Sequence, residues 1–242
     1  MKKILLAGAA LTTLAMPAMA ADMATKAPVY TKAPPMVAVY NWTGCYLGGE
    51  GGGAWGRSRD YNAASGNAFT NSFNLSGGIA GGTLGCNYEV SNVVFGIEGD
   101  ISWTNKSGST TDIAVPTTTN TTSEKWLDTV RGRVGFAWDR VLFFATGGGA
   151  FANVSFSACN SVTGLCDNGS QNLSGWTAGG GLEWAFADNW SAKLEYLHVD
   201  LGTGNLGAAP TFTARNIPVT DDIFRVGVNY RINWGGPVVA RY

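Results

Sequence analysis

The sequence predicts an all-β protein, an eight-stranded antiparallel transmembrane β-barrel, on three observations. The chain is rich in glycine and aromatic residues and poor in charge, with 34 Gly, 9 Trp and 14% Asp, Glu, Lys and Arg. From Trp42 onward, apolar segments follow one another at about the 9–11 residues that a strand needs to cross a bilayer. The connectors between them alternate strictly between long and short, which is typical of barrels with turns at one end and loops at the other.

The N-terminus has the three-part layout of a secretory signal peptide. Met1-Lys2-Lys3 is followed by an apolar stretch from Ile4 to Met16 and by the small-residue site Ala18-Met19-Ala20. The apolar stretch is too short for a spanning helix of about 20 residues. We therefore expect residues 1–20 to be a cleaved signal peptide, residues 21–41 a proline-containing periplasmic tail, and residues 42–242 the barrel.

The charge balance excludes one class of partner. Removal of Lys2 and Lys3 from the 16 Lys and Arg leaves 14 against 17 Asp and Glu, so the mature chain is mildly acidic and lacks the basic footprint of a nucleic-acid binder. No later segment is a long uninterrupted apolar run, so a membrane-bound chain would have to cross with strands. Only helices and closed barrels pair all their backbone groups internally in hydrocarbon.

The strand boundaries follow from the alternation between segments rich in aromatic residues, Val, Ile and Gly and the connectors between them. The eight expected strands are Trp42–Trp55, Ser72–Glu89, Val93–Thr104, Glu124–Trp138, Val141–Phe156, Leu173–Phe186, Trp190–Leu201 and Asp222–Ile232. The three short connectors are 90–92, 139–140 and 187–189, and the four long ones are 56–71, 105–123, 157–172 and 202–221. This rhythm places both termini on the periplasmic side and the long loops outside the cell.

Alternation along the strands separates an apolar face from a charged one. In the third strand Phe95, Ile97 and Ile101 share one face, opposite Glu98 and Asp100. A barrel in lipid must be apolar outside, so the charges are expected inside. The expected lumen charge network consists of Glu98, Asp100, Arg131, Arg133, Glu183, Lys193, Glu195, Arg225 and Arg231. Tryptophans 42, 103, 126, 138, 184 and 190 lie near strand ends, as is typical of a membrane interface.

The four cysteines are expected to form disulfides, because export permits them. Cys159 and Cys166 flank a short polar segment, which makes a local bridge the economical pairing and leaves Cys45 with Cys86. A zinc site is the competing idea, but the sequence has no CxxC pair and a single histidine, His198. We expect no metal and no cofactor.

The motifs of the barrel resemble a known family, the outer-membrane β-barrel, porin-like surface proteins of alphaproteobacteria, which are distantly similar to the OmpA transmembrane barrel. The resemblance covers the chain from Trp42 onward and depends on 41–49 (NWTGCYLGG), 85–88 (GCNY), 131–135 (RGRVG), 194–197 (LEYL) and 225–236 (RVGVNYRINWGG). It implies an outer-membrane location, insertion by the barrel-assembly machinery and a surface or envelope role. Outer-membrane lipid and lipopolysaccharide are expected partners of such a barrel. These are scaffold motifs, and they carry no catalytic residue.

The end of the barrel departs from the usual pattern of that family. The last clear strand ends near Ile232, and Pro237 to Tyr242 still follow. Tyr242 could therefore replace the usual terminal aromatic assembly signal, or the residues after Ile232 could be a tail.

Three functions from different classes remain open. The first is a surface and envelope protein whose lumen is closed, because an eight-stranded interior is just wide enough to be filled by side chains. The second is a narrow porin with weak cation preference from the inward carboxylates. The third is a lipid-modifying enzyme that uses His198, with Ser191 or Ser174 as nucleophile, although nothing near His198 in the sequence completes such a set.

Any recognition is expected in the loops, where barrels place their variable surfaces. The partner there could be a host surface or a small molecule. The resembling family includes hemin-binding members, but an axial ligand must be His, Cys, Met or Tyr. The loops offer only Tyr61 and the expected disulfide cysteines.

Overall fold

The computed structural model describes residues 40–207 and 213–232. The expected signal peptide, residues 21–39 of the expected tail and the C-terminal residues through Tyr242 lie outside this part of the chain. The last strand is described as far as Ile232. Within the described residues, no helix is long and apolar enough to cross a membrane.

All regular structure in the described residues is strand. The elements are β1 (Gly44–Ser58), β2 (Tyr61–Asn62), β3 (Phe73–Val90), β4 (Val93–Thr104), β5 (Ser107–Thr111), β6 (Thr118–Trp138), β7 (Val141–Asn160), β8 (Cys166–Ala185), β9 (Trp190–Leu206) and β10 (Arg215–Ile232).

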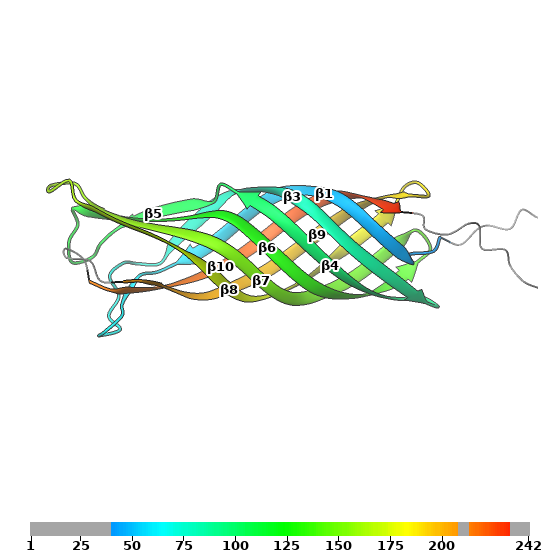
Figure 1. Ribbon diagram of the computed structural model, residues 1–242, viewed down its shortest axis with the longest axis horizontal. Coiled ribbons are helices and arrows are strands. Elements are labelled where there is room, and N and C mark those ends of the chain that lie inside the picture. The colour runs from blue at the N-terminus through cyan, green and yellow to red at the C-terminus, as the bar shows by residue number, and fades with distance from the viewer. Residues whose placement is uncertain (1–39, 208–212, 233–242) are drawn as a thin grey trace, which may run out of the picture. The chain divides into compact units, whose positions relative to one another are not determined.

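Eight of these strands form a closed antiparallel ring. Each long strand pairs with its neighbours along the chain, and β1 pairs with both β3 and β10, which closes the sheet. The two short strands extend this ring: β5 pairs with β6 beyond the end of β4, and β2 pairs with β10 beyond the end of β1. Figure 1 shows the tilted strands of this barrel. The predicted fold class is therefore confirmed.

Several strands run further than the sequence pattern predicted. The polar segments 118–123, 157–160, 166–172 and 215–221, which were expected in loops, all belong to strands. Many of these residues are Thr, Ser or Asn. Threonine is favourable in strands because it is β-branched, but a strand of threonines has no apolar face for the sequence pattern to reveal. An apolar outer face is needed only where a strand contacts lipid. The alternation of apolar and polar residues therefore marks the membrane-spanning part of each strand and not the whole strand.

The two ends of the barrel differ, and we name them by their connections. The turn end carries the short connections β3–β4, β6–β7 and β8–β9, and the loop end carries the long ones. Ser91 and Asp139 occupy the first two turns with positive φ, 58° and 53°, which such tight hairpins require. In outer-membrane barrels the short turns face the periplasm, so the loop end is the end expected outside the cell.

The outer surface is an apolar belt between two rings of aromatic side chains. Ile97, Ile101 and Val130 are more than half exposed in the belt, although they are large and apolar. Exposed tryptophans and tyrosines flank the belt at the loop end (Trp55, Trp103, Trp176, Tyr196) and at the turn end (Tyr88, Trp138, Trp184, Trp190, Tyr230). Such rings are typical of both water–lipid interfaces of a transmembrane barrel.

Trp42 does not belong to either ring. It was expected to start the first strand at the membrane interface, but it precedes β1 and is buried, at 3% exposed. It packs in a cluster with Tyr40, Val94, Ala137, Leu142 and Ala185 at the turn end of the barrel. Its indole Nε1 donates to the Asp139 carbonyl, 3.2 Å away. The segment before β1 therefore packs across strands at the turn-end mouth.

Both disulfides join residues that face each other on paired strands. Cys45 and Cys86 are register partners on β1 and β3, and Cys159 and Cys166 are register partners at the end of the β7–β8 hairpin. Each bridge therefore spans strands that a ladder of backbone hydrogen bonds already holds together.

We predict that reduction leaves the barrel assembled. The closed ladder carries the fold, and a disulfide contributes mainly by restricting the unfolded chain. Protein treated with dithiothreitol should keep heat-modifiable migration on a gel, like the untreated protein. Migration of the reduced, unheated sample at the position of the unfolded chain would contradict the prediction.

Candidate functional site

The centre of the barrel interior is an ion cluster around Arg131 on β6. Its guanidinium contacts three carboxylates: Glu98 at 2.6 Å, Asp100 at 2.8 Å and Glu195 at 2.7 Å. Its Nε donates to the Thr129 hydroxyl, 2.8 Å away. Glu98 is the register partner of Arg131 on β4, whereas Glu195 belongs to β9 across the lumen. Arg131 thus connects opposite walls of the barrel.

Arg225 on β10 is a second centre of the same cluster. It forms ion pairs with Glu195 at 2.7 Å, with Asp100 at 3.1 Å and with Glu50. Two of these carboxylates also contact Arg131, so the two guanidinium groups share their partners. A planar guanidinium with five donors suits such sharing better than a point charge does.

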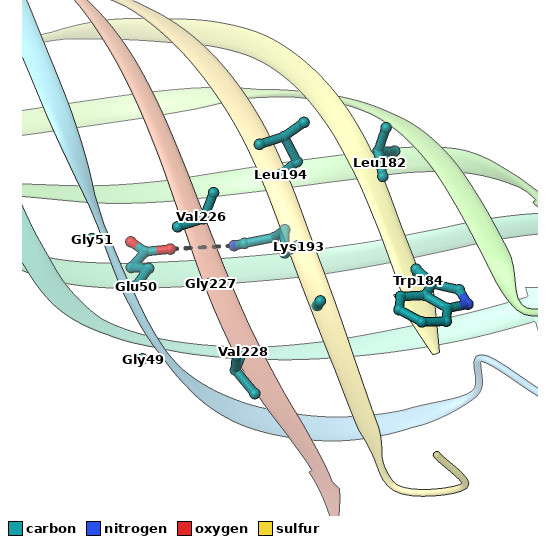
Figure 2. Close-up of a pocket in the computed structure, with 11 residues that line it drawn as sticks. Gly49, Glu50, Gly51, Leu182, Trp184, Lys193, Leu194, Val226, Gly227 and Val228 are labelled. Atoms are coloured by element: carbon teal, nitrogen blue, oxygen red, sulfur yellow. Dashed lines mark ion pairs between the residues drawn. The ribbon is translucent and has the colours of Figure 1, made fainter. Parts of the chain in front are cut away.

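Lys193 extends the cluster to β1. Its ammonium lies 3.0 Å from Glu98 and 3.4 Å from Glu50. Figure 2 shows Glu50 and Lys193 reaching toward each other past β10 near Gly227. A Cβ at Gly227 would lie only 3.2 Å from the Glu50 Cβ, so the glycine leaves room for the glutamate. Val226 and Val228, on either side of this glycine, face the lipid.

Arg133 carries the cluster toward the turn end. It contacts Glu183 at 2.8 Å, and it donates to the Tyr46 hydroxyl, which in turn donates to Glu98 at 2.6 Å. The second oxygen of Glu183 accepts from Ser191 and from Asn229. All these side chains are buried. We call the set the lumen network; its members are Tyr46, Glu50, Glu98, Asp100, Arg131, Arg133, Glu183, Lys193, Glu195 and Arg225.

Arg231 was expected in the lumen network, but it lies outside it. The side chain sits near the end of β10, where it donates to the carbonyls of Asn41 and Asp188. Its guanidinium stacks over the Tyr40 ring at 4.5 Å. Arg231 occupies an inward position in the alternation of β10, but it lies at the end of the strand. A side chain there can bind the chain segments at the mouth of the barrel and need not enter the lumen.

Apolar side chains fill the interior on the loop-end side of the lumen network. Leu127, Leu197, Val199 and Ile223 belong to one buried cluster there, in which each is at most 1% exposed. The full cluster includes Ala54, Ile79, Ala150, Ala152, Val154, Phe156, Leu173, Leu201, Ile217 and Val219. A buried ion triad lies alongside: Lys106 pairs with Glu124 at 2.8 Å and with Asp221.

A smaller polar cluster lies among the loops, around Arg215 at the start of β10. Its guanidinium contacts Asp60 at 3.4 Å and Asp112 at 3.3 Å, and it donates to the amide oxygen of Asn120 at 2.9 Å. All four side chains are buried. Burial raises the pKa of the Asp60 carboxyl, an effect that the Arg215 charge opposes.

His198 faces the lipid side of the barrel at the loop-end aromatic ring. Its Nδ1 lies 2.8 Å from Asp222, which also accepts the Tyr196 hydroxyl at 2.7 Å, and its ring contacts Trp176. Its register partners are Ala178 and Asp222, so neither serine of the enzyme hypothesis lies beside it. Ser191 instead binds Glu183 in the lumen, and Ser174 pairs with Phe151 on β7.

Sequence reasoning missed two groups of these residues. Glu50 stands in the glycine run 48–53, where no face was assigned, although alternation from the apolar Leu47 would have indicated an inward position. Lys106 and Asp60 were read as loop residues, because only the fold turns them inward. Tyr61, the one loop tyrosine considered for hemin, lies in β2 with the Arg59 guanidinium 5.3 Å from its ring centroid.

A closed ring of eight long strands, an apolar belt between aromatic rings and an ionic interior define a transmembrane β-barrel of the outer-membrane class. Comparison with known proteins agrees with this assignment. The family model for the outer membrane protein beta-barrel domain matches residues 6–231. The chain belongs to this family, and it is an outer-membrane protein.

The curated relatives are outer-membrane proteins of bacteria. The 31 kDa outer-membrane immunogenic protein of Brucella melitensis is 33% identical over 242 residues, covering 96% of this chain and all of the relative. The 25 kDa outer-membrane immunogenic protein of the same organism is 29% identical over 233 residues, covering 96% and 98%. The crystal structure of Neisserial surface protein A covers 78% of this chain and 98% of its own, at 12% identity and a TM-score of 0.40.

We predict that Arg131→Met destabilises the barrel by about 3–5 kcal/mol, because it removes the one cation that contacts three buried carboxylates at once and leaves the lumen network with uncompensated negative charge. Arg140→Met is the matched control, since Arg140 pairs at 3.4 Å with an exposed Asp188 at the turn end. Loss of that exposed pair should cost less than about 1 kcal/mol. Urea unfolding in lipid vesicles, followed by tryptophan fluorescence, measures both. Equal midpoints for the two variants would count against the lumen network.

Proposed function

We propose that this protein is a structural and surface-interacting component of the outer membrane whose lumen is closed and whose recognition surface is formed by its loops. The observation that carries the proposal is the lumen network, in which four cations and five carboxylates from opposite walls contact one another across the interior. An eight-stranded barrel has little room beyond its own side chains.

Two further layers support a closed lumen. The apolar cluster around Leu127 and Leu197 lies between the lumen network and the loop end. Tyr40 and Trp42 pack at the turn-end mouth. An ion entering from either side would have to displace apolar side chains before it reached the lumen network, and it would lose hydration in doing so.

The outer surfaces of the barrel suggest its partners. The apolar belt fits the lipid, and the loop-end aromatic ring fits the glycolipid layer of the outer leaflet, so we propose lipopolysaccharide as the lateral neighbour. Assembly by the barrel-assembly machinery follows from family membership and is part of the proposal. The two Brucella relatives are described as immunogenic proteins, which supports exposure of the loops to other cells.

The proposal predicts that purified protein in planar bilayers gives no sustained, reproducible conductance steps. The reason is that the lumen network and the apolar layers leave no continuous hydrated path. Single-channel recording in potassium chloride is the measurement, with a known porin reconstituted in the same lipid as the positive control. Stable steps of one unit size, seen in independent preparations, would show that the porin alternative is correct.

The proposal also predicts no role for His198 in lipid chemistry. His198→Ala removes the ring that contacts Asp222 and Trp176 but changes no lumen side chain. Mass spectrometry of envelope lipids should give the same composition in cells that carry either form. A lipid species that disappears in the variant, and returns when the wild-type gene is restored, would establish the enzymatic alternative.

A further inference from the structure

A pocket of about 370 Å³ opens among the loops, and the lumen network does not reach it. Its walls come from four separate segments: the connection between β2 and β3, the β5–β6 turn, the β7–β8 turn and the start of β10. Its volume lies near the lower end of the roughly 300–1,000 Å³ typical of small-molecule sites. The lining residues are Phe69, Asp112, Ala114, Val115, Thr118, Asn160, Thr163, Leu165, Thr213 and Arg215.

Hydrogen bonds between the loops hold these walls together. The Ile113 amide donates to the Phe69 carbonyl at 2.7 Å, which joins the β5–β6 turn to the segment before β3. The Ser161 amide donates to the Thr117 carbonyl at 2.9 Å, which joins the same turn to the β7–β8 turn. The Cys159–Cys166 bridge closes the latter. A site with fixed walls loses less entropy when a ligand binds.

Arg215, the cation in the pocket lining, is already paired with two buried carboxylates, so this group has an excess of negative charge. Arg215 is held between Asp60 and Asp112, and one oxygen of Asp112 also accepts the amides of Ala114 and Val115. The group therefore offers no net positive charge to an anion. The Asp112 carboxylate is also occupied, so it has little to offer a cation.

The pocket keeps free hydrogen-bonding capacity beside an apolar wall. Thr213 is an exposed residue of the pocket lining, and the Nε of the buried Arg215 has no hydrogen-bond partner among the described residues. The hydroxyls of Thr118 and Thr163 accept bonds but still have protons to donate. Phe69, whose ring stacks against the Arg215 guanidinium at 4.5 Å, forms the apolar side.

From these features we infer that the loop-end pocket binds an uncharged saccharide, a single ring or a disaccharide. A sugar ring presents hydroxyls at its edge, which can both donate and accept, and C–H groups on its faces, which pack against an aromatic ring. The inference deepens the proposed surface role and rests on the loops being the recognition surface. The saccharide could belong to the cell's own lipopolysaccharide or to a foreign cell surface.

The test uses the full-length protein in lipid nanodiscs on a glycan array that carries neutral, amino and acidic sugars. The array includes fragments of the producing cell's own polysaccharide and glycans from other organisms, so it identifies the source. Titration calorimetry with each neutral saccharide bound then gives the Kd. We expect binding to neutral glycans. Binding to acidic glycans alone, to amino glycans alone, or to none at millimolar concentration, would overturn the inference.

A matched pair of variants ties the binding to the pocket. Thr213→Val removes one lining hydroxyl with little change of shape, and it should raise Kd about three- to tenfold, the value of one hydrogen bond. Thr119→Val is the control, because Thr119 is exposed on β6 and lies outside the pocket lining. Equal affinities for the two variants would place the sugar elsewhere and overturn the assignment.

The outcome is separable from that of the proposed function. A barrel that conducts ions but binds a neutral sugar through Thr213 would overturn only the closed lumen. A barrel that is sealed but binds no neutral sugar would overturn only the inference about the pocket.

Discussion

Mutual neutralisation of charge inside a closed barrel is the constraint on which the rest of this structure depends. A strand that crosses lipid must present apolar side chains outward, and its alternate positions then face a narrow interior where an unpaired charge is costly. Arg131 meets this constraint by contacting Glu98, Asp100 and Glu195 at once. Because Glu195 lies on the opposite wall, one arginine also fixes how the walls face each other.

This constraint also divides the molecule by role. The side chains of the belt between the aromatic rings contact lipid, and the charged side chains of the interior pair with one another. Any chemistry directed at other molecules is therefore proposed for the loop end, where Arg215, Asp112 and Phe69 line a pocket outside the lumen network. The polar hairpin arms of β6, β7 and β8, which extend past the apolar belt, build that end as ordered structure.

The features that could be predicted from the sequence are those that depend on the alternation of residues along a strand and on the lengths of the connectors. The ring of eight strands and the inward positions of Glu98 and Arg131 could be derived, because a period of two separates the faces of a strand. The extra length of the strands could not, since threonine-rich arms in water have no apolar face. Trp42 and Arg231 were misplaced because both lie at the turn-end mouth, where packing across strands replaces alternation. The loop-end pocket depends on contacts between four distant segments, which no local pattern contains.

The most direct test of the central claim is a double-mutant cycle between Arg131 and Glu195, measured as the free energy of unfolding in lipid vesicles. Arg131→Met and Glu195→Met each remove one buried partner of the other side chain and change the charge balance of the lumen network, whereas the double variant removes both charges. The account predicts that the double variant is destabilised by clearly less than the sum of the two single variants, with a coupling of more than about 1 kcal/mol. Additive effects would show that the two side chains do not stabilise one another across the lumen.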